Sequence, residues 1–184
     1  PSTDMHERIL IVDFGSQYTQ LIARRVREHH VFSEVVPAHL AHEHLGDDLK
    51  GIILSGGPAS AYHADAPVMD ACILDAGVPI LGICYGLQWL CHHLDGKVVP
   101  GGEEREFGFT PLQVLKAEGI FSGVNPQTVV WMSHGDRVEK LPSGFERMAQ
   151  TDSCPEAAIG DDQRKIYGLQ FHPEVAHTRE GATI

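Results

Sequence analysis

The clearest indication of the architecture is Val78-Pro-Ile-Leu-Gly-Ile83, an apolar run that leads directly into Cys84-Tyr-Gly86. Because a helical pattern follows over residues 87–94, the run predicts a buried strand that turns sharply into a helix. Similar patterns predict strands at residues 8–14, 31–36 and 52–54, and helices at residues 17–30 and 66–76. Strands that are apolar throughout and alternate with helices indicate a parallel sheet covered on both faces.

The second half of the chain has four strand-like segments close together, with turn residues between them: 109–115, 128–132, 145–151 and 165–171. This spacing favours antiparallel strands that extend the sheet. We therefore expect a single three-layer α/β domain, with a mostly parallel open sheet, helices on both faces and antiparallel additions in the second half. The domain is expected to span residues 7–184, after a polar N-terminal extension over residues 1–6.

Length and composition exclude several classes of protein. The 184 residues, 42% hydrophobic and 21% charged, are typical of a globular domain with a full core. Because 14 Lys and Arg oppose 25 Asp and Glu, the formal charge is −11, which disfavours nucleic acid or an anionic membrane as partner. No apolar run approaches the roughly 20 residues of a membrane span, and no secretion signal precedes the first strand, so a cytoplasmic location is expected.

The cysteines and histidines do not form a metal-binding pattern. The four cysteines have no C-x-x-C spacing, and a chain of this length needs no disulfide framework. Of the twelve histidines, the pairs His29-His30 and His92-His93 are expected to point to different helix faces, and three more, His39, His42 and His44, stand in a polar connecting stretch. We therefore expect solvated surface histidines there and no metal site.

The segment Gly82-Ile-Cys-Tyr-Gly86 has the form G-x-C-x-G, the thiol counterpart of the G-x-S-x-G nucleophile elbow. Cys84 is expected on a strained strand-to-helix turn, where a side chain at either flanking glycine would collide with neighbouring backbone. The unpaired N–H groups of the following helix favour the thiolate, and the N–H of Tyr85 can face an oxyanion. The alternative is a buried cysteine without a chemical role.

A base for this thiol is available in His172-Pro-Glu174, which follows the last predicted strand. The two segments can meet in space although they are far apart in the sequence. Glu174 can reach the imidazole nitrogen that does not face the thiol, and would hold the tautomer of His172. Taken alone, these residues could equally be a loop after a strand.

The segment Ser55-Gly-Gly-Pro-Ala-Ser60 has two interpretations. It could be a phosphate cradle similar to the S-G-G-x-D-S loop of ATP pyrophosphatases, but Pro58 removes an N–H and no aspartate is present. We favour the other interpretation, a glycine turn that gives a second backbone donor to an oxyanion hole.

Together these motifs resemble the class I (triad) glutamine amidotransferases, and within them the glutaminase domains of GMP synthetases. Gly82–Gln88 and His172–Glu174 are shared across the class. The GMP synthetase branch is indicated by residues 11–18 (IVDFGSQY), 54–58 (LSGGP), 105–108 (REFG), 132–136 (MSHGD) and 170–178 (QFHPEVAHT). The resemblance covers about residues 7 to 181.

The resemblance implies a mechanism and its residues. The Cys84 thiolate attacks the side-chain carboxamide of glutamine, and the N–H groups of Gly57 and Tyr85 hold the oxyanion. His172 protonates the departing ammonia and then activates water, while Glu174 orients the imidazole.

Substrate-binding residues are implied as well: Gln88, Ser133, His134, Gly135 and Asp136. Without the resemblance, Gln88 would be a polar contact on a helix face and the loop a plain turn.

The resemblance further implies a partner for GMP biosynthesis, an ATP-pyrophosphatase (synthetase) domain or subunit that uses the ammonia to convert XMP to GMP. ATP and Mg²⁺ are expected only there, so no cofactor is expected in this chain. Because residues 181–184 end inside an expected last helix and no S-G-G-x-D-S loop is present, we expect an excised domain or a separate subunit.

Other functions stay open on the same fold. After the glutaminase, the second is a γ-glutamyl hydrolase, a thiol peptidase or another class I amidotransferase. A regulatory binding module with a vestigial elbow is a third, but the intact set Cys84, His172 and Glu174 argues against it.

Overall fold

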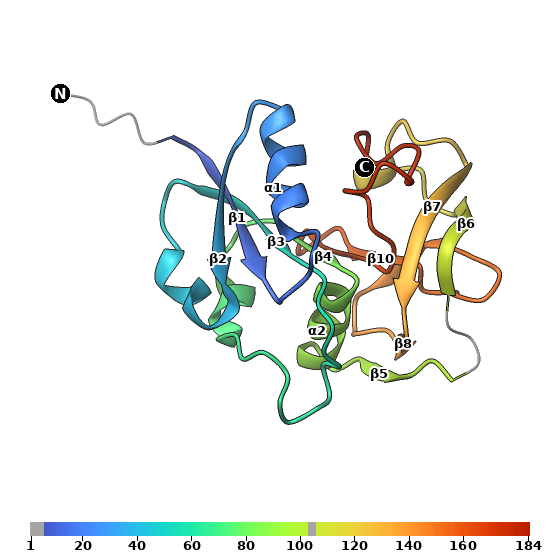
Figure 1. Cartoon of the computed structure of the whole chain (residues 1–184), viewed down its shortest axis with the longest axis horizontal. Coiled ribbons are helices and arrows are strands. Elements are labelled where there is room, and N and C mark those ends of the chain that lie inside the picture. The colour runs from blue at the N-terminus through green and yellow to red at the C-terminus, as the bar shows by residue number, and fades with distance from the viewer. Residues whose placement is uncertain (1–5, 103–105) are drawn as a thin grey trace.

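A nine-stranded sheet forms the centre of the computed structural model, which describes residues 6–102 and 106–184 (Figure 1). Its first five strands in space are parallel: β2 (Phe32–Pro37), β1 (Arg8–Asp13), β3 (Leu49–Leu54), β4 (Ile80–Ile83) and β11 (Ile166–Leu169). Four antiparallel strands continue the sheet: β10 (Ala158–Asp161), β9 (Glu146–Gln150), β6 (Glu106–Val114) and β7 (Gln127–His134). The expected mostly parallel sheet with antiparallel additions is confirmed.

Two α-helices in the described residues cover opposite faces of the parallel strands. On one face, α1 (Thr19–Glu28) places Ile22 against the buried Ile11 of β1. On the other face, α2 (Tyr85–His93) places Trp89 among buried side chains that include Leu10. Since successive residues of a strand point to opposite faces, β1 contributes to both layers.

Shorter elements complete the layers. Within residues 6–102 and 106–184, three 3₁₀ helices lie outside the sheet: η1 (Ala38–His44), η2 (Ala71–Asp75) and η3 (Gly119–Phe121). The sequence patterns do not predict a second, two-stranded sheet of β5 (Lys97–Pro100) and β8 (Asp136–Lys140), which packs Val98 and Val138 against Leu87 of α2.

The segment 66–76 is not the α-helix that its apolar spacing predicts. Only Ala71–Asp75 is helical, as the 3₁₀ helix η2, and Asp70 before it is extended. The Asp70 carboxylate accepts a 2.9 Å hydrogen bond from the N–H of Cys72, so a new turn begins there. Pro67 also disfavours a helical conformation for the residue before it.

Two further expectations need correction. The spacing of the second half predicts an antiparallel strand at 165–171, but β11 runs parallel to β4 and antiparallel only to β10. Residues 181–184 form turns rather than part of a helix: the N–H of Gly181 donates to the carbonyl of Thr178, and the N–H of Thr183 donates to that of Glu180.

A cavity of about 490 Å³ lies on the α1 face of the sheet, lined by residues of α1, by Leu81 of β4 and by the C-terminal segment 173–184. No helix in the described part of the chain has the length and apolar character required to cross a membrane. The expected N-terminal extension lies outside the described residues, apart from His6.

Candidate active site

Cys84 occupies the turn between β4 and α2, at the carboxyl edge of the parallel strands. Its backbone has φ 52° and ψ −104°, in the region that residues other than glycine rarely adopt. The N–H of Cys84 donates to the carbonyl of Leu169 at 2.7 Å, and its Sγ donates to the carbonyl of Ser133 at 3.5 Å. The strand pairing therefore holds a strained cysteine at the end of the sheet.

The two flanking glycines are required by close backbone contacts. A Cβ on Gly82 would lie 2.6 Å from backbone atoms of Gly86, and a Cβ on Gly86 would lie 2.4 Å from the carbonyl oxygen of Leu54. This is the collision that the G-x-C-x-G spacing predicts.

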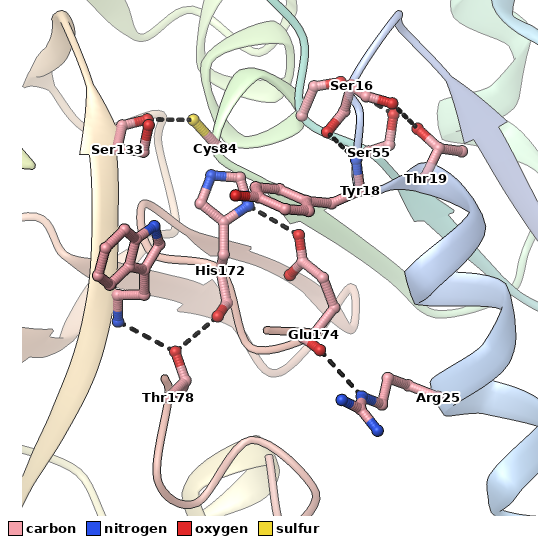
Figure 2. A network of polar contacts seen from close by, with 12 residues as sticks. Ser16, Tyr18, Thr19, Arg25, Ser55, Cys84, Ser133, His172, Glu174 and Thr178 are labelled. Atoms are coloured by element: carbon pink, nitrogen blue, oxygen red, sulfur yellow. Dashed lines mark hydrogen bonds and ion pairs between the residues drawn. The ribbon is translucent and has the colours of Figure 1, made fainter. Parts of the chain in front are cut away.

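His172 and Glu174 form a buried pair beside the cysteine. The Nδ1 of His172 lies 2.7 Å from Oε1 of Glu174, so its N–H donates to the carboxylate. The two residues are only 4% and 3% exposed. Figure 2 shows the imidazole between the Cys84 sulfur and the Glu174 carboxylate, with its two ring nitrogens directed to opposite sides.

The surroundings raise the pKa of His172 to about 10. Burial by itself lowers this pKa, but hydrogen bonding to Cys84 and to Glu174, together with electrostatic interaction with both residues, outweighs it. The imidazole is therefore protonated at neutral pH and can act as an acid toward a leaving group.

Backbone and ring contacts fix the position of His172. Its N–H donates to the carbonyl of Trp131 at 3.0 Å, and its own carbonyl accepts from Thr178 Oγ1 at 2.6 Å. The same Thr178 hydroxyl accepts from the N–H of Trp131 at 3.0 Å. The ring of Tyr18 lies edge-on to the imidazole, with 5.4 Å between centroids (Figure 2).

A cavity of about 350 Å³ opens at these residues. Five predicted site residues take part in its lining or in the adjacent turn: Gly57, Cys84, Ser133 and His172 line it, and Tyr85 follows Cys84 directly. A Cβ on Gly57 would lie 2.5 Å from the carbonyl oxygen of Phe14, so this turn also requires glycine. The oxyanion role of Gly57 and Tyr85 stays a prediction.

The Tyr85 side chain turns away from this cavity into the core. Its ring packs against Phe14, with 4.9 Å between centroids, and burial raises the pKa of its phenol to about 12. Only its backbone N–H is therefore available to chemistry at the turn.

The other predicted substrate-binding residues do not line the cavity; these are Gln88, His134, Gly135 and Asp136. The Nε2 of Gln88 donates to the carbonyl of Asp136 at 3.5 Å, and Nδ1 of His134 lies 2.8 Å from the same oxygen. The Asp136 carboxylate accepts from the hydroxyls of Ser60 and Tyr62, at 2.5 and 3.2 Å. Gly135 accepts from the N–H of Gly101 at 2.7 Å.

Sequence reasoning missed several residues of the site. The loop Gly15–Tyr18 lines the cavity, and the Nε2 of the fully buried Gln170 lies 3.7 Å from the Cys84 sulfur. Arg25 of α1 donates from Nε to the backbone carbonyl of Glu174 at 2.9 Å. The loop could have been found, because it follows β1 at the same edge of the sheet as Cys84.

The histidines and cysteines do not gather into a metal centre. Across residues 6–102 and 106–184, the structure contains no group of three or more His, Cys, Asp or Glu side chains arranged to hold a metal ion.

Comparison with known proteins identifies related sequences. The family model for glutamine amidotransferase class-I matches residues 10–184. A GMP synthase [glutamine-hydrolyzing] of Heliobacterium modesticaldum is 51% identical over 177 residues, which are 96% of this chain and 34% of that protein. The protein of the same name from Rhodopseudomonas palustris is 52% identical over 184 residues, 98% of this chain and 34% of its own length.

Solved structures have the same fold. A protein from Thermoplasma acidophilum that is named as a GMP synthase subunit superposes with a TM-score of 0.83. The two chains are 33% identical, over 97% of this chain and 89% of that one. A glutamine amidotransferase from Thermotoga maritima gives a TM-score of 0.75 at 23% identity, over 92% and 77% of the two chains. The chain thus spans about a third of the length of its sequence relatives and most of the length of these structures.

Proposed function

The chain belongs to the class I glutamine amidotransferase family, and from this we propose that it hydrolyses L-glutamine to glutamate and ammonia as the glutaminase part of a GMP synthase. The observation that carries the proposal is the arrangement of Cys84, His172 and Glu174, with a strained cysteine beside a protonated imidazole that a buried carboxylate orients. Such an arrangement supports nucleophilic attack on an amide.

The first half of the reaction forms a thioester. The Cys84 thiolate attacks the side-chain carbonyl carbon of glutamine, a C–S bond forms, and the C=O electron pair moves to oxygen. When this oxyanion collapses, the C–N bond breaks and His172 gives its proton to the nitrogen, so ammonia leaves. The N–H groups of Gly57 and Tyr85 serve as donors to the oxyanion, which is where such stabilisation has its largest effect.

The second half releases glutamate. His172, now neutral, takes a proton from water while the oxygen attacks the thioester carbonyl. The C–S bond then breaks, Cys84 leaves as thiolate, and the imidazole is again protonated. Glu174 holds the ring through Nδ1 during both proton transfers, so the other nitrogen stays directed at the reacting atoms.

The ammonia is consumed by a synthetase partner, either a further domain of the same polypeptide or a separate subunit. This is supported by relatives named GMP synthase [glutamine-hydrolyzing] that are about three times as long as this chain. That partner would hold ATP and Mg²⁺ and would convert XMP to GMP with the ammonia. The residues of this chain supply only the hydrolysis of glutamine.

A glutamine-like diazo-ketone tests the assignment. It should alkylate Cys84, located by mass spectrometry of peptides, and block release of glutamate from glutamine. Cys72 is an internal control, because it is an exposed free thiol outside the site and reacts with any unselective reagent. Labelling of Cys72 in preference to Cys84 would contradict the proposal, and turnover of γ-glutamyl peptides but not glutamine would favour a γ-glutamyl hydrolase.

A further inference from the structure

A group of aromatic side chains, exposed except for one half-buried indole, lies next to the candidate site and has no role in the proposed chemistry. It consists of Phe107 and Phe109 of β6, Trp131 of β7, and His177, and is called the aromatic strip below. Phe107 and Phe109 are 68% and 65% exposed. The Phe109 ring lies 5.4 Å from the rings of Trp131 and His177, which are themselves 4.6 Å apart. The rings of Phe109, Trp131 and His177 therefore form one continuous surface.

The aromatic strip is linked to the nucleophile through Ser133 of β7. In the β6–β7 pairing, Phe107 is opposite Ser133 and Phe109 is opposite Trp131. Ser133 lines the active-site cavity, and its carbonyl accepts from the Cys84 thiol. Because Phe107 and Phe109 are two residues apart on one strand, they share the outward face of the hairpin and extend it away from the cavity.

An unpaired outer strand does not explain why the aromatic strip is exposed. The outer edge of β7 is already closed by the C-terminal segment, where Phe171 bridges to Met132 and the N–H of Arg179 donates to the carbonyl of Val129. Side chains on the inward face of the hairpin, such as Leu112, are buried. Adjacent, strongly exposed phenylalanines beside a reaction site are typical of a protein contact surface.

We propose that the aromatic strip is the surface on which the synthetase part of the enzyme docks, through an apolar face of its own. The proposal rests on the proposed function. About two thirds of each relative's length lies outside this chain, and that larger part must approach the cavity if it is to receive ammonia before the ammonia escapes to water. The strip is an apolar surface that borders the cavity, and none of its four side chains is acidic.

The test uses the full polypeptide that contains both parts. The double variant Phe107→Ser/Phe109→Ser is compared with Phe32→Ser, a matched control on β2, which lies at the opposite edge of the sheet (Figure 1) and is 57% exposed. Three rates are measured: glutamate release, GMP synthesis from glutamine, and GMP synthesis from added ammonia.

We expect the double variant to lose about tenfold in GMP formed per glutamate released, since aromatic anchors dominate contact energies. Its synthesis from added ammonia and its glutamate release should stay at the wild-type level, as should all three rates of the control. A double variant with the wild-type ratio of GMP to glutamate overturns the docking surface. Absence of glutamate release from the wild type would instead overturn the proposed function.

A second measurement needs no substitution. Hydroxyl-radical labelling followed by mass spectrometry should modify Phe107 and Phe109 in this chain alone and spare them in the full polypeptide, while Phe32 is labelled equally in both. Equal labelling of Phe107 and Phe109 in both forms would also overturn the proposal.

Discussion

The hydroxyl of Thr178 donates a 2.6 Å hydrogen bond to the backbone carbonyl of His172, and it also accepts the N–H of Trp131. Thr178 is a positioning residue, because it reaches the reaction only through the backbone of the candidate base. It is buried, so both of its backbone partners would lack a replacement if the hydroxyl were removed.

Replacing this hydroxyl tests its role. We expect Thr178→Val to lower kcat for glutamine hydrolysis about 10- to 100-fold with little change in KM, because the imidazole shifts relative to the bound substrate. Unfolding should need about 1–3 kcal/mol less free energy. Thr178→Ser restores the hydroxyl and should recover most of the rate; equal losses in both variants would show that the hydrogen bonds are irrelevant.

The backbone strain at Cys84 leads to a second prediction. Cys84→Ala should abolish glutamine hydrolysis and leave the fold intact. Cys84→Gly should be equally inactive but about 1 kcal/mol more stable than Cys84→Ala, because glycine tolerates the φ of 52°. Chemical denaturation of the two variants measures the difference, and a less stable glycine variant would contradict the strain.

The elbow glycines give a third prediction. Gly86→Ala should cost about 3 kcal/mol of unfolding free energy, since its Cβ would lie 2.4 Å from a backbone oxygen of the sheet. Gly51→Ala is the matched control: its Cβ would meet Cδ1 of Ile9 at 3.0 Å, at the movable end of a side chain. We expect a change below about 1 kcal/mol there. Thermal denaturation of both variants provides the comparison.

The raised pKa of His172 predicts how stability depends on pH. The folded pKa is about 10 and the ordinary value is 6.5, so the folded state holds a proton that the unfolded state loses. The resulting stabilisation is complete below pH 6.5 and is lost as the pH rises toward 10, by at most about 1.4 kcal/mol per pH unit.

His172→Gln removes this titration and should flatten the dependence over the same pH range. NMR titration measures the pKa of the His172 imidazole directly. This pKa should fall in Cys84→Ala, because one of the groups that raise it is absent. An unchanged pKa in that variant would show that Cys84 does not raise the pKa of His172.

Much of the catalytic geometry could be predicted because its signals are local. The apolar run before Cys84 and the flanking glycines define a strand-to-helix turn, and the structure has that turn with backbone contacts that allow no Cβ at either glycine. The pairing of His172 with Glu174 follows from their two-residue separation across a proline.

Features that depend on distant partners could not be predicted. Whether β11 runs parallel or antiparallel to its neighbour depends on its place beside β4, which no local pattern reveals. The β5–β8 pair joins short strands with several charged residues, so it has no clear alternation. In the segment 66–76, a local hydrogen bond to Asp70 overrides an apolar spacing that fits a helix.

Trp131 holds His172 and Thr178 through main-chain hydrogen bonds, while its half-buried indole packs against the rings of Phe109 and His177. Any amino acid other than proline could therefore preserve the ladder that holds the imidazole. The proposed docking surface can therefore change at this position while the hydrogen bonds that hold the imidazole stay in place.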